Sequence, residues 1–366
     1  MTSLKLTGHR IHTIRLPYRR AVQWVNHAED GVDLLLLVLE TDAGFMGVGE
    51  AVLRLNWTGA TAKTLPVVLE EIFLPRLQGV DLADPKAVAR ALRVVPEHAL
   101  AKSVIDTACW DLRAQASGRP LWQHLGGGAD SVPVSWTLTR AEPRVMAHEA
   151  EDMRVRYGFE TFKVKTGQGL ATDRAALGAI RAAVGPDLRL YADFNGACEP
   201  AEVGRATQML AEFGVEVAED PCPLSPSSEF RHIKEASAVP ILVDGACRSI
   251  EQARLFIDAG AETISVKVPK SGITESLDIA AAAEEAGVSV CVGLGATTSL
   301  GAVVALSLAS ALPSGAIDLP CEETFYFQFA EEYVTAPLAV ASGHVTLPPS
   351  TGLHDLVDWR KVEASR

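Results

Sequence analysis

The sequence lacks any long hydrophobic run. Its longest fully apolar stretch is six residues, Leu34 to Leu39, whereas a membrane span needs about 20. The N-terminal segment also lacks the apolar core of a signal peptide. These two absences argue against a membrane protein and against export, so we expect a cytoplasmic location.

Positive charge and cysteine are also scarce. The 33 Lys and Arg residues are outnumbered by 46 Asp and Glu, and the net charge is −13. Nucleic acids are bound through clustered Lys and Arg, so no nucleic-acid partner is expected. The six cysteines form no C-x-x-C pair, which predicts reduced thiols rather than a zinc site or a disulfide framework.

The middle of the chain contains a regular alternation of strand-like and helix-like segments. Strands that are apolar on both faces and alternate with helices pair in parallel. Eight such units predict a closed barrel rather than an open sheet. The eight strand-like runs are residues 132–139, 161–166, 188–195, 215–220, 240–245, 263–268, 288–294 and 316–320.

The two ends of the chain follow a different pattern. Residues 1–125 contain strand-like stretches followed by helical ones, which is typical of an α+β domain. Residues from about 330 to 366 have no βα pattern and are predicted to complete this N-terminal domain. The predicted fold is therefore α/β, with a modified (β/α)8, TIM-like barrel over residues 126–329 and an α+β N-terminal capping domain.

Charged residues recur at the ends of the predicted strands. Four successive spacings between them are 28, 26, 25 and 23 residues, one βα unit each. Equal steps place these groups at one height, at the C-terminal mouth where barrel active sites lie. The residues concerned are Lys163, Lys165, Asp193, Asn195, Glu219, Asp220, Asp244 and Lys267.

Three carboxylates that converge from adjacent strands would repel one another without a cation. Asp193, Glu219 and Asp244 offer hard oxygen ligands, which favour Mg²⁺. Lys165 and Lys267 flank the trio, and a lysine close to Mg²⁺ and to another lysine has its ammonium form disfavoured. Such a site is suited to removing the proton next to a carboxylate and stabilising the enediolate that results. The alternative is a set of structural ion pairs.

As a set, these motifs resemble those of the enolase superfamily, specifically the muconate-lactonizing subgroup of the mandelate racemase/muconate lactonizing enzyme family. The resemblance extends over nearly the whole chain. It implies that Lys165 and Lys267 are acid/base groups on opposite faces of the substrate and that the three carboxylates bind Mg²⁺. It also implies that Lys163 touches the substrate carboxylate. Asn195 and Asp220 would either support these ligands or serve as spare ones.

The resemblance also places substrate specificity in the capping domain. The candidate lid loops are residues 19–31, with Trp24, and residues 51–62, with Trp57. Asp318, at the end of the predicted eighth strand, is a further candidate substrate contact. An aromatic wall suited to an apolar or quaternary-ammonium group would consist of Trp24, Trp57, Trp136, Phe325 and Tyr326.

Some positions depart from the family pattern. Gly245 and Ala246 stand where Glu-Ser is usual, and the predicted eighth strand lacks the Asp-x-Asp with which dipeptide epimerases hold a substrate ammonium group. The missing Asp-x-Asp argues against a dipeptide substrate, and the missing Glu-Ser is compatible with a catalytically silent barrel. The glycine-rich stretch Gly293–Gly301 is compatible with a phosphate site, although close helix–strand packing is the favoured interpretation.

The sequence therefore predicts an Mg²⁺-dependent enzyme acting on a small carboxylate substrate. Lysines on both faces favour a racemase or epimerase of an amino-acid derivative. The alternatives are a muconate-type cycloisomerase, a dehydratase of a hydroxy or imino acid, a Schiff-base aldolase and a catalytically silent barrel. The resemblance also implies a homo-oligomer.

Overall fold

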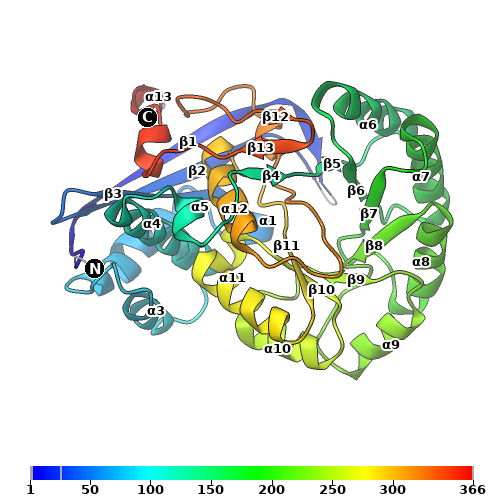
Figure 1. Ribbon diagram of the computed structural model, residues 1–366, viewed down its shortest axis with the longest axis horizontal. Helices are drawn as coiled ribbons and strands as arrows, with labels where there is room; N and C mark the ends of the chain where they lie inside the picture. The colour runs from blue at the N-terminus through cyan, green and yellow to red at the C-terminus, as the bar shows by residue number, and fades with distance from the viewer. Residues whose placement is uncertain (1–2, 25–26, 365–366) are drawn as a thin grey trace.

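The computed structural model describes residues 3–24 and 27–364. An antiparallel N-terminal sheet with its helices lies on one side, and a curled parallel sheet surrounded by helices lies on the other (Figure 1). This architecture confirms the predicted α/β fold with a TIM-like barrel and an α+β N-terminal part. The domain boundaries at residues 125 and 329 stay predictions.

The strand β2 (Ala28–Thr41) is the centre of the N-terminal sheet. It pairs in antiparallel fashion with β1 (Leu6–Gln23) on one side and β3 (Met46–Leu53) on the other. Side chains alternate across a strand. Within residues 34–39, the odd-numbered side chains therefore pack into the core of the N-terminal part and the even-numbered ones into the barrel core. The longest apolar run of the sequence is thus a strand buried on both faces.

Two glycines of β3 allow a helix to lie directly on the sheet. A Cβ on Gly47 would lie 2.2 Å from the carbonyl oxygen of Ala108, and a Cβ on Gly49 would lie 2.1 Å from that of Val104. Both carbonyls belong to α4 (Ala99–Ser117). The other helical segments of this part are α1 (Leu55–Thr58), α2 (Thr64–Val67), the π-helical η1 (Val68–Phe73), the 3-10 turn η2 (Leu74–Leu77), α3 (Pro85–Arg93) and α5 (Leu121–His124).

Seven parallel strands form the barrel wall in the spatial order β11-β10-β9-β8-β7-β6-β5. They are β5 (Trp136–Leu138), β6 (Thr161–Lys165), β7 (Arg189–Asp193), β8 (Val215–Glu219), β9 (Ile241–Val243), β10 (Thr263–Val266) and β11 (Ser289–Val292). Helices cover the outside of this wall (Figure 1). They are α6 (Pro143–Tyr157), α7 (Leu170–Val184), α8 (Val203–Glu212) after the turn η3 (Pro200–Glu202), α9 (Ser228–Ala236), α10 (Ile250–Asp258), α11 (Val268–Glu285) and α12 (Ser299–Ala311).

The eighth strand predicted at residues 316–320 is not formed, and this expectation was wrong. An irregular segment takes its place. Cys321 exchanges backbone hydrogen bonds with the chain just before β5, and the N–H of Glu322 donates to the carbonyl of Val292 at the end of β11. Pro320 has no N–H to donate to a ladder, so the pairing that closes the barrel starts only after it.

The C-terminal segment connects the barrel with the N-terminal sheet. β4 (Ser131–Pro133), which the sequence analysis joined to β5, instead pairs with β13 (His344–Thr346). Further along, the N–H of Leu353 donates to Asp111 of α4, and the final helix lies beside β1 (Figure 1). The remaining elements are η4 (Phe325–Gln328), β12 (Val340–Ala341), η5 (Leu353–Leu356) and α13 (Trp359–Ala364).

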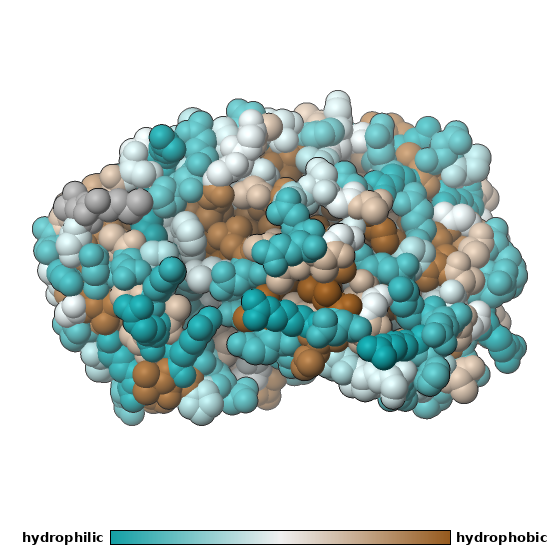
Figure 2. Space-filling model, turned by 60° about the horizontal axis from the view of Figure 1, so that its bottom comes forward, coloured by the Kyte–Doolittle hydropathy of each residue, from teal (hydrophilic) through white to brown (hydrophobic). Residues whose placement is uncertain are grey.

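Figure 2 shows hydrophilic side chains over most of one face, with hydrophobic ones in separate patches. No helix among the described residues is both long enough and apolar enough to cross a membrane. All six cysteines are free thiols, as predicted.

Candidate active site at the barrel mouth

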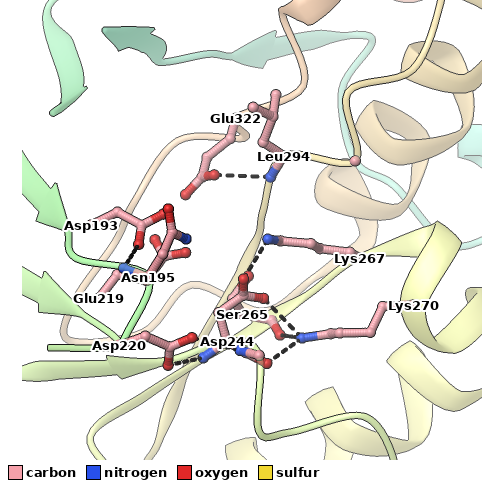
Figure 3. Close-up of polar contacts among 12 residues, drawn as sticks. Asp193, Asn195, Glu219, Asp220, Asp244, Ser265, Lys267, Lys270, Leu294 and Glu322 are labelled. Carbon is pink, nitrogen blue, oxygen red and sulfur yellow. Dashed lines mark hydrogen bonds and ion pairs between the residues drawn. The ribbon is translucent and has the colours of Figure 1, made fainter. Parts of the chain in front are cut away.

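The three predicted metal ligands lie at the ends of adjacent strands. Asp193 ends β7 and Glu219 ends β8, where the two are register partners, and Asp244 directly follows β9. All three residues are buried at the same end of the barrel (Figure 3). The regular spacing in the sequence therefore does bring these carboxylates together.

Lys165 and Lys267 stand on opposite sides of these carboxylates. Lys165 ends β6, and Lys267 follows β10, four positions away in a barrel with eight positions. The Nζ of Lys165 lies 2.5 Å from Asp193 Oδ2, and the Nζ of Lys267 lies 2.5 Å from Asp244 Oδ2. Both lysines line one cavity of about 350 Å³, so a molecule in this cavity has an amine on each side.

Lys163 is enclosed by carboxylates. Its Nζ lies 3.1 Å from Asp193 Oδ2, 2.6 Å from Glu219 Oε2 and 2.9 Å from Glu322 Oε2. Burial alone would lower the pKa of Lys163, but the three carboxylates outweigh burial and raise this pKa well above its ordinary value. Lys163 is therefore a fixed ammonium ion. It also lines the cavity, and its contact with a substrate carboxylate stays a prediction.

Sequence reasoning missed two acidic residues of the site, Glu322 and Glu323. Both are buried. Glu322 binds Lys163 and also accepts a hydrogen bond from the N–H of Leu294 at 2.9 Å. Leu294 and Glu322 are 28 residues apart, the same step that separates Lys165 from Asp193. This 28-residue step could have predicted Glu322 as a site residue. The strand predicted at 316–320 instead made Asp318 the candidate at that position.

Asp318 does not lie at the mouth. It is exposed, its carbonyl accepts a hydrogen bond from Arg189 at 2.8 Å, and it lines a different cavity at the strand N-termini. Arg189 is the first residue of β7, whereas Asp193 is the last. The structure thus places Asp318 at the opposite end of the barrel. The prediction that it contacts substrate followed from a strand that is not formed.

Four glutamate carboxylates, of which those of Glu322 and Glu323 are buried, hold the loop between β11 and α12. The backbone N–H groups of residues 294, 295, 297, 298 and 299 donate to glutamates from three parts of the chain. Within this run, the N–H of Ala296 alone has no acceptor among the described residues. The pairs are Leu294 with Glu322, Gly295 and Thr297 with Glu323, Thr298 with Glu50, and Ser299 with Glu332. The amides that a phosphate would need are therefore occupied, so this stretch serves packing rather than phosphate binding.

Asp220 and Asn195 hold the chain around the ligands. Asp220 accepts hydrogen bonds from the N–H groups of Asp244 at 3.0 Å and Gly245 at 2.8 Å. Asn195 accepts one from Lys165 at 3.2 Å. A Cβ on Gly245 would lie 3.1 Å from Asp220 Oδ2, so the glycine that departs from the family pattern leaves room for this carboxylate. Both residues thus lie beside the predicted ligands, and whether they support these ligands or serve as spare ones stays a prediction.

The sequence predicted a lysine whose ammonium form is disfavoured, but the pKa of Lys267 beside Asp244 is raised. Burial lowers the pKa of Lys267, but Asp244 outweighs burial and raises it. In turn, burial raises the pKa of Asp244, and Lys267 and Lys270 outweigh it and hold this pKa well below its usual range. Lys270 is itself buried and donates to Asp244 at 3.0 Å. Without a further cation, both partners of this pair are therefore charged.

The donor set fits a hard divalent cation. Among the described residues, no three His, Cys, Asp or Glu side chains are drawn close enough together to enclose a metal, and the ammonium of Lys163 bridges Asp193 and Glu219 instead. Glu219 Oε1 is buried without a hydrogen-bond donor among the described residues, and Oε2 has only the ammonium of Lys163, 2.6 Å away. Burial, reinforced by Asp193, raises the pKa of Glu219 well above its ordinary value. The site thus holds oxygen ligands whose negative charge is not fully compensated.

The capping domain contributes one wall of the cavity. Trp24 and Trp57 both line it, and the Nζ of Lys267 lies 5.9 Å from the Trp57 ring centroid. Within the predicted lid loop 19–31, residues 25–26 lie outside the described part of the chain. Phe325 stacks on Trp24 with ring centroids 5.5 Å apart. Phe325 itself and the other two residues of the predicted aromatic wall, Trp136 and Tyr326, do not line this cavity.

An eight-position barrel with three carboxylates between two lysines, covered by an α+β domain, defines an enzyme of the enolase superfamily. The family model described as "Mandelate racemase / muconate lactonizing enzyme, N-terminal domain" matches residues 6–126, and "Enolase C-terminal domain-like" matches residues 145–359. The chain belongs to the mandelate racemase/muconate lactonizing enzyme family. The members of this family to which its sequence is similar include epimerases and cycloisomerases, which are isomerases.

Three known proteins illustrate this similarity. A hydrophobic dipeptide epimerase from Enterococcus faecalis is 32% identical over 77% of this chain and 80% of its own length. The chloromuconate cycloisomerase CbnB from Cupriavidus necator is 30% identical over 98% of both chains. The solved structure of the dipeptide epimerase from Enterococcus faecalis V583 with Mg and L-Leu-L-Tyr has a TM-score of 0.86 at 27% identity and covers 96% of this chain and 99% of that one.

Proposed function

We propose that the protein is an Mg²⁺-dependent racemase or epimerase that removes the α-proton of an amino-acid derivative. The observation that carries this proposal is the position of Lys165 and Lys267, half a barrel apart, with three carboxylates on the strands between them. A substrate between two amines can lose a proton to one face and regain it from the other. The relatives that act on dipeptides support the same chemistry.

The residues of the chain divide this work between them. Asp193, Glu219 and Asp244 would hold Mg²⁺, which when bound supplies positive charge for the two oxygens of an enediolate. Lys165 would move the proton on one face and Lys267 on the other. Lys163, a permanent cation fixed by Glu322 and its neighbours, would orient the substrate carboxylate. Trp24 and Trp57 would exclude water from the side of the capping domain.

A muconate-type cycloisomerase is the second candidate. It is favoured by the similarity to chloromuconate cycloisomerase, which extends over 98% of both chains. In this reaction one lysine transfers the proton and the other need not. A dehydratase requires the same first step. An aldolase is supported least, because a Schiff base makes no use of the three carboxylates between the lysines and the relatives named above are isomerases.

The test is hydrogen exchange at the α-carbon. The protein is incubated with Mg²⁺ in D₂O and with single stereoisomers of N-acyl amino acids, and the α-hydrogen is followed by NMR. We expect deuterium in both stereoisomers. Lys165→Ala should abolish exchange from one stereoisomer and Lys267→Ala from the other. The exposed Lys86→Ala should change neither.

Other outcomes identify other functions. Loss of a β-substituent indicates a dehydratase, and lactone formation from cis,cis-muconate indicates a cycloisomerase. Exchange that persists when both lysines are replaced would contradict the proposal.

We also propose a homo-oligomer in the cytoplasm, to be checked by light scattering and by fractionation.

A further inference from the structure

Lys267, the proposed acid/base residue after β10, is followed by one helical turn that is not continuous with the rest of α11. Gly272 interrupts this helix with a φ of +77° and a ψ of 179°. Residues 268–271 therefore form a separate turn. The carbonyl of Lys267 accepts hydrogen bonds from the N–H groups of Lys270 at 2.9 Å and of Ser271 at 3.0 Å. The position of this turn thus sets the point from which the Lys267 side chain reaches into the site.

The second half of α11 has no capping side chain of its own. The first N–H groups of a helix lack intrahelical acceptors, and a Ser, Thr, Asp or Asn side chain at the preceding position usually accepts them. Gly272 occupies that position. Asp106 of α4, in the capping domain, accepts instead, because its Oδ2 lies 2.8 Å from the N–H groups of Ile273 and Thr274. A Cβ on Gly272 would lie only 3.0 Å from this oxygen, so the close approach favours glycine.

Further contacts join α4 to the same part of α11. Asp106 Oδ1 accepts a hydrogen bond from Thr274 Oγ1 at 2.6 Å, and Trp110 Nε1 donates to that hydroxyl at 2.9 Å. The hydroxyl of Ser103 donates to the carbonyl of Val268, within the isolated turn. Ser103 and Asp106 are both buried. The capping domain therefore holds the turn that follows Lys267 as well as the helix start behind it.

The isolated turn also carries Lys270, which holds Asp244. The Lys270 Nζ donates to Asp244 Oδ1 at 3.0 Å, to the Asp244 carbonyl at 2.8 Å and to the Ser265 carbonyl at 2.7 Å. The Nζ of Lys267 lies 2.5 Å from the other carboxylate oxygen of Asp244. A displacement of the turn would therefore move two lysines relative to one predicted metal ligand.

We propose that Asp106 is a positioning residue for Lys267, so that the capping domain sets the place of this amine at the barrel mouth. The inference rests on the proposed function in one respect, namely that Lys267 moves a proton. Asp106 does not line the cavity. Among the described residues, no hydrogen bond or ion pair joins Lys165 to α4. The effect of Asp106 should therefore fall on one face of the substrate only.

The first experiment measures α-proton exchange in D₂O separately for the two stereoisomers of an N-acyl amino acid, with Mg²⁺ present. Lys267→Ala identifies the stereoisomer whose proton Lys267 removes. Asp106→Ala should slow exchange from that stereoisomer about 10- to 100-fold and exchange from the other less than about threefold, because small misplacements of a reacting group are costly. KM should change little. Asp106→Asn keeps an acceptor oxygen and should restore most of the rate.

Two further variants test whether the effect is specific. Asp111→Ala is the matched control, because Asp111 is a buried carboxylate of the same helix but accepts from the N–H groups of Val48 and Leu353. It should affect both stereoisomers equally or neither. Ser103→Ala removes a milder contact and should slow exchange from the Lys267 stereoisomer alone, about two- to fivefold. If Asp106→Ala does not fold, Ser103→Ala decides in its place.

A second readout does not depend on activity. Lysine labelled with ¹³C at Cε gives one NMR signal for each side chain, and Lys→Arg variants assign the signals. Asp106→Ala should shift the signals of Lys267 and Lys270, which belong to or adjoin the isolated turn. The signal of Lys165, on the opposite side of the barrel, should stay in place. Asp106→Asn should shift the signals of Lys267 and Lys270 less than Asp106→Ala does.

The outcomes separate this inference from the proposed function. Equal slowing of both stereoisomers in Asp106→Ala, or no slowing at all, would overturn the positioning role. Unchanged signals of Lys267 and Lys270 would also overturn it. Signals of Lys267 that shift in a protein without any α-proton exchange would refute the racemase proposal and leave the positioning of Lys267 by Asp106 in place.

Discussion

Glu50 of β3 accepts a hydrogen bond from the backbone N–H of Thr298, 3.1 Å away, at the start of α12. The hydroxyl groups of Thr298 and Tyr333 donate to the other oxygen of the same carboxyl group. A single buried side chain therefore joins the capping sheet, the last barrel helix and the C-terminal segment. The protonation state of Glu50 therefore affects the stability of the contacts between these three parts.

The stability of the protein should fall as the pH rises toward neutrality. Burial raises the pKa of Glu50 to about 7 from an ordinary value of 4.5. The folded state thus binds this proton more tightly than the unfolded state, so the stabilisation is complete below about pH 4.5 and is lost as the pH rises to about 7. The loss amounts to about 3 kcal/mol.

Glu50→Gln should remove this part of the pH dependence. Urea unfolding at pH 5, 6, 7 and 8 gives the free energy of unfolding of both proteins, and the curve of the variant should be flatter by about 3 kcal/mol over this range. Glu71→Gln, at an exposed position, should keep the slope of the wild-type protein. Parallel curves for wild type and Glu50→Gln would show that Glu50 does not titrate in this range.

Replacing Lys163 should make the fold depend on Mg²⁺. Lys163→Met leaves the buried carboxylates of Asp193, Glu219 and Glu322 without their shared cation, which costs about 3–5 kcal/mol. A divalent ion on the same carboxylates restores the charge balance. We therefore expect a melting temperature that rises more with Mg²⁺ in the variant than in the wild-type protein. Scanning calorimetry with and without EDTA measures this, and equal shifts would argue against an ion at these carboxylates.

Glu219→Gln should separate stability from metal binding. Burial and Asp193 already disfavour the charged form of Glu219, so a neutral amide should leave the metal-free protein equally stable or more stable by about 1 kcal/mol. The same change removes an anionic ligand and should weaken Mg²⁺ binding about 10- to 100-fold, as titration calorimetry would show. A variant that is destabilised and binds Mg²⁺ normally would identify Glu219 as a structural residue.

Two glycines should respond differently to alanine. In Gly49→Ala the new Cβ would meet the carbonyl oxygen of Val104 in α4 at 2.1 Å, and backbone cannot move aside without shifting the helix. We expect a loss of at least about 3 kcal/mol. Gly44 has a φ of +79° in a turn with open space around it, so Gly44→Ala should cost only about 1 kcal/mol. Urea unfolding of both variants gives the comparison, and equal losses would contradict the close packing of α4 on β3.

Much of the site could be predicted because it follows the period of the fold. One βα unit has a nearly constant length, so Asp193, Glu219 and Asp244 occur at regular intervals in the chain and at one height in the barrel. The two lysines follow the same rule. The barrel itself was predictable from the same alternation of strands and helices.

The parts that escaped prediction do not follow this period. Glu322 and Glu323 belong to an irregular segment, where apolar residues and a proline suggested a strand that ended too early. Arg54 follows β3 like any polar residue at a strand end, and only the packing of two domains places it in the cavity. Its partners Trp24 and Glu29 both lie in the predicted lid loop 19–31, and Trp24 was a predicted contact, but nothing in the sequence indicated that either would pack against Arg54.

Because β2 is buried on both faces, the two halves of the protein cannot be exchanged independently of each other. Alternate side chains of residues 34–39 belong to the core of the capping domain and to that of the barrel, so the strand is a wall common to both. Neither half can be exchanged with a homologous half unless the replacement reproduces both patterns in one strand. Chimaeras joined within the connection after α5 would have to satisfy the same two burial patterns. New substrate specificity would therefore evolve through changes in the loops and not through replacement of a whole domain.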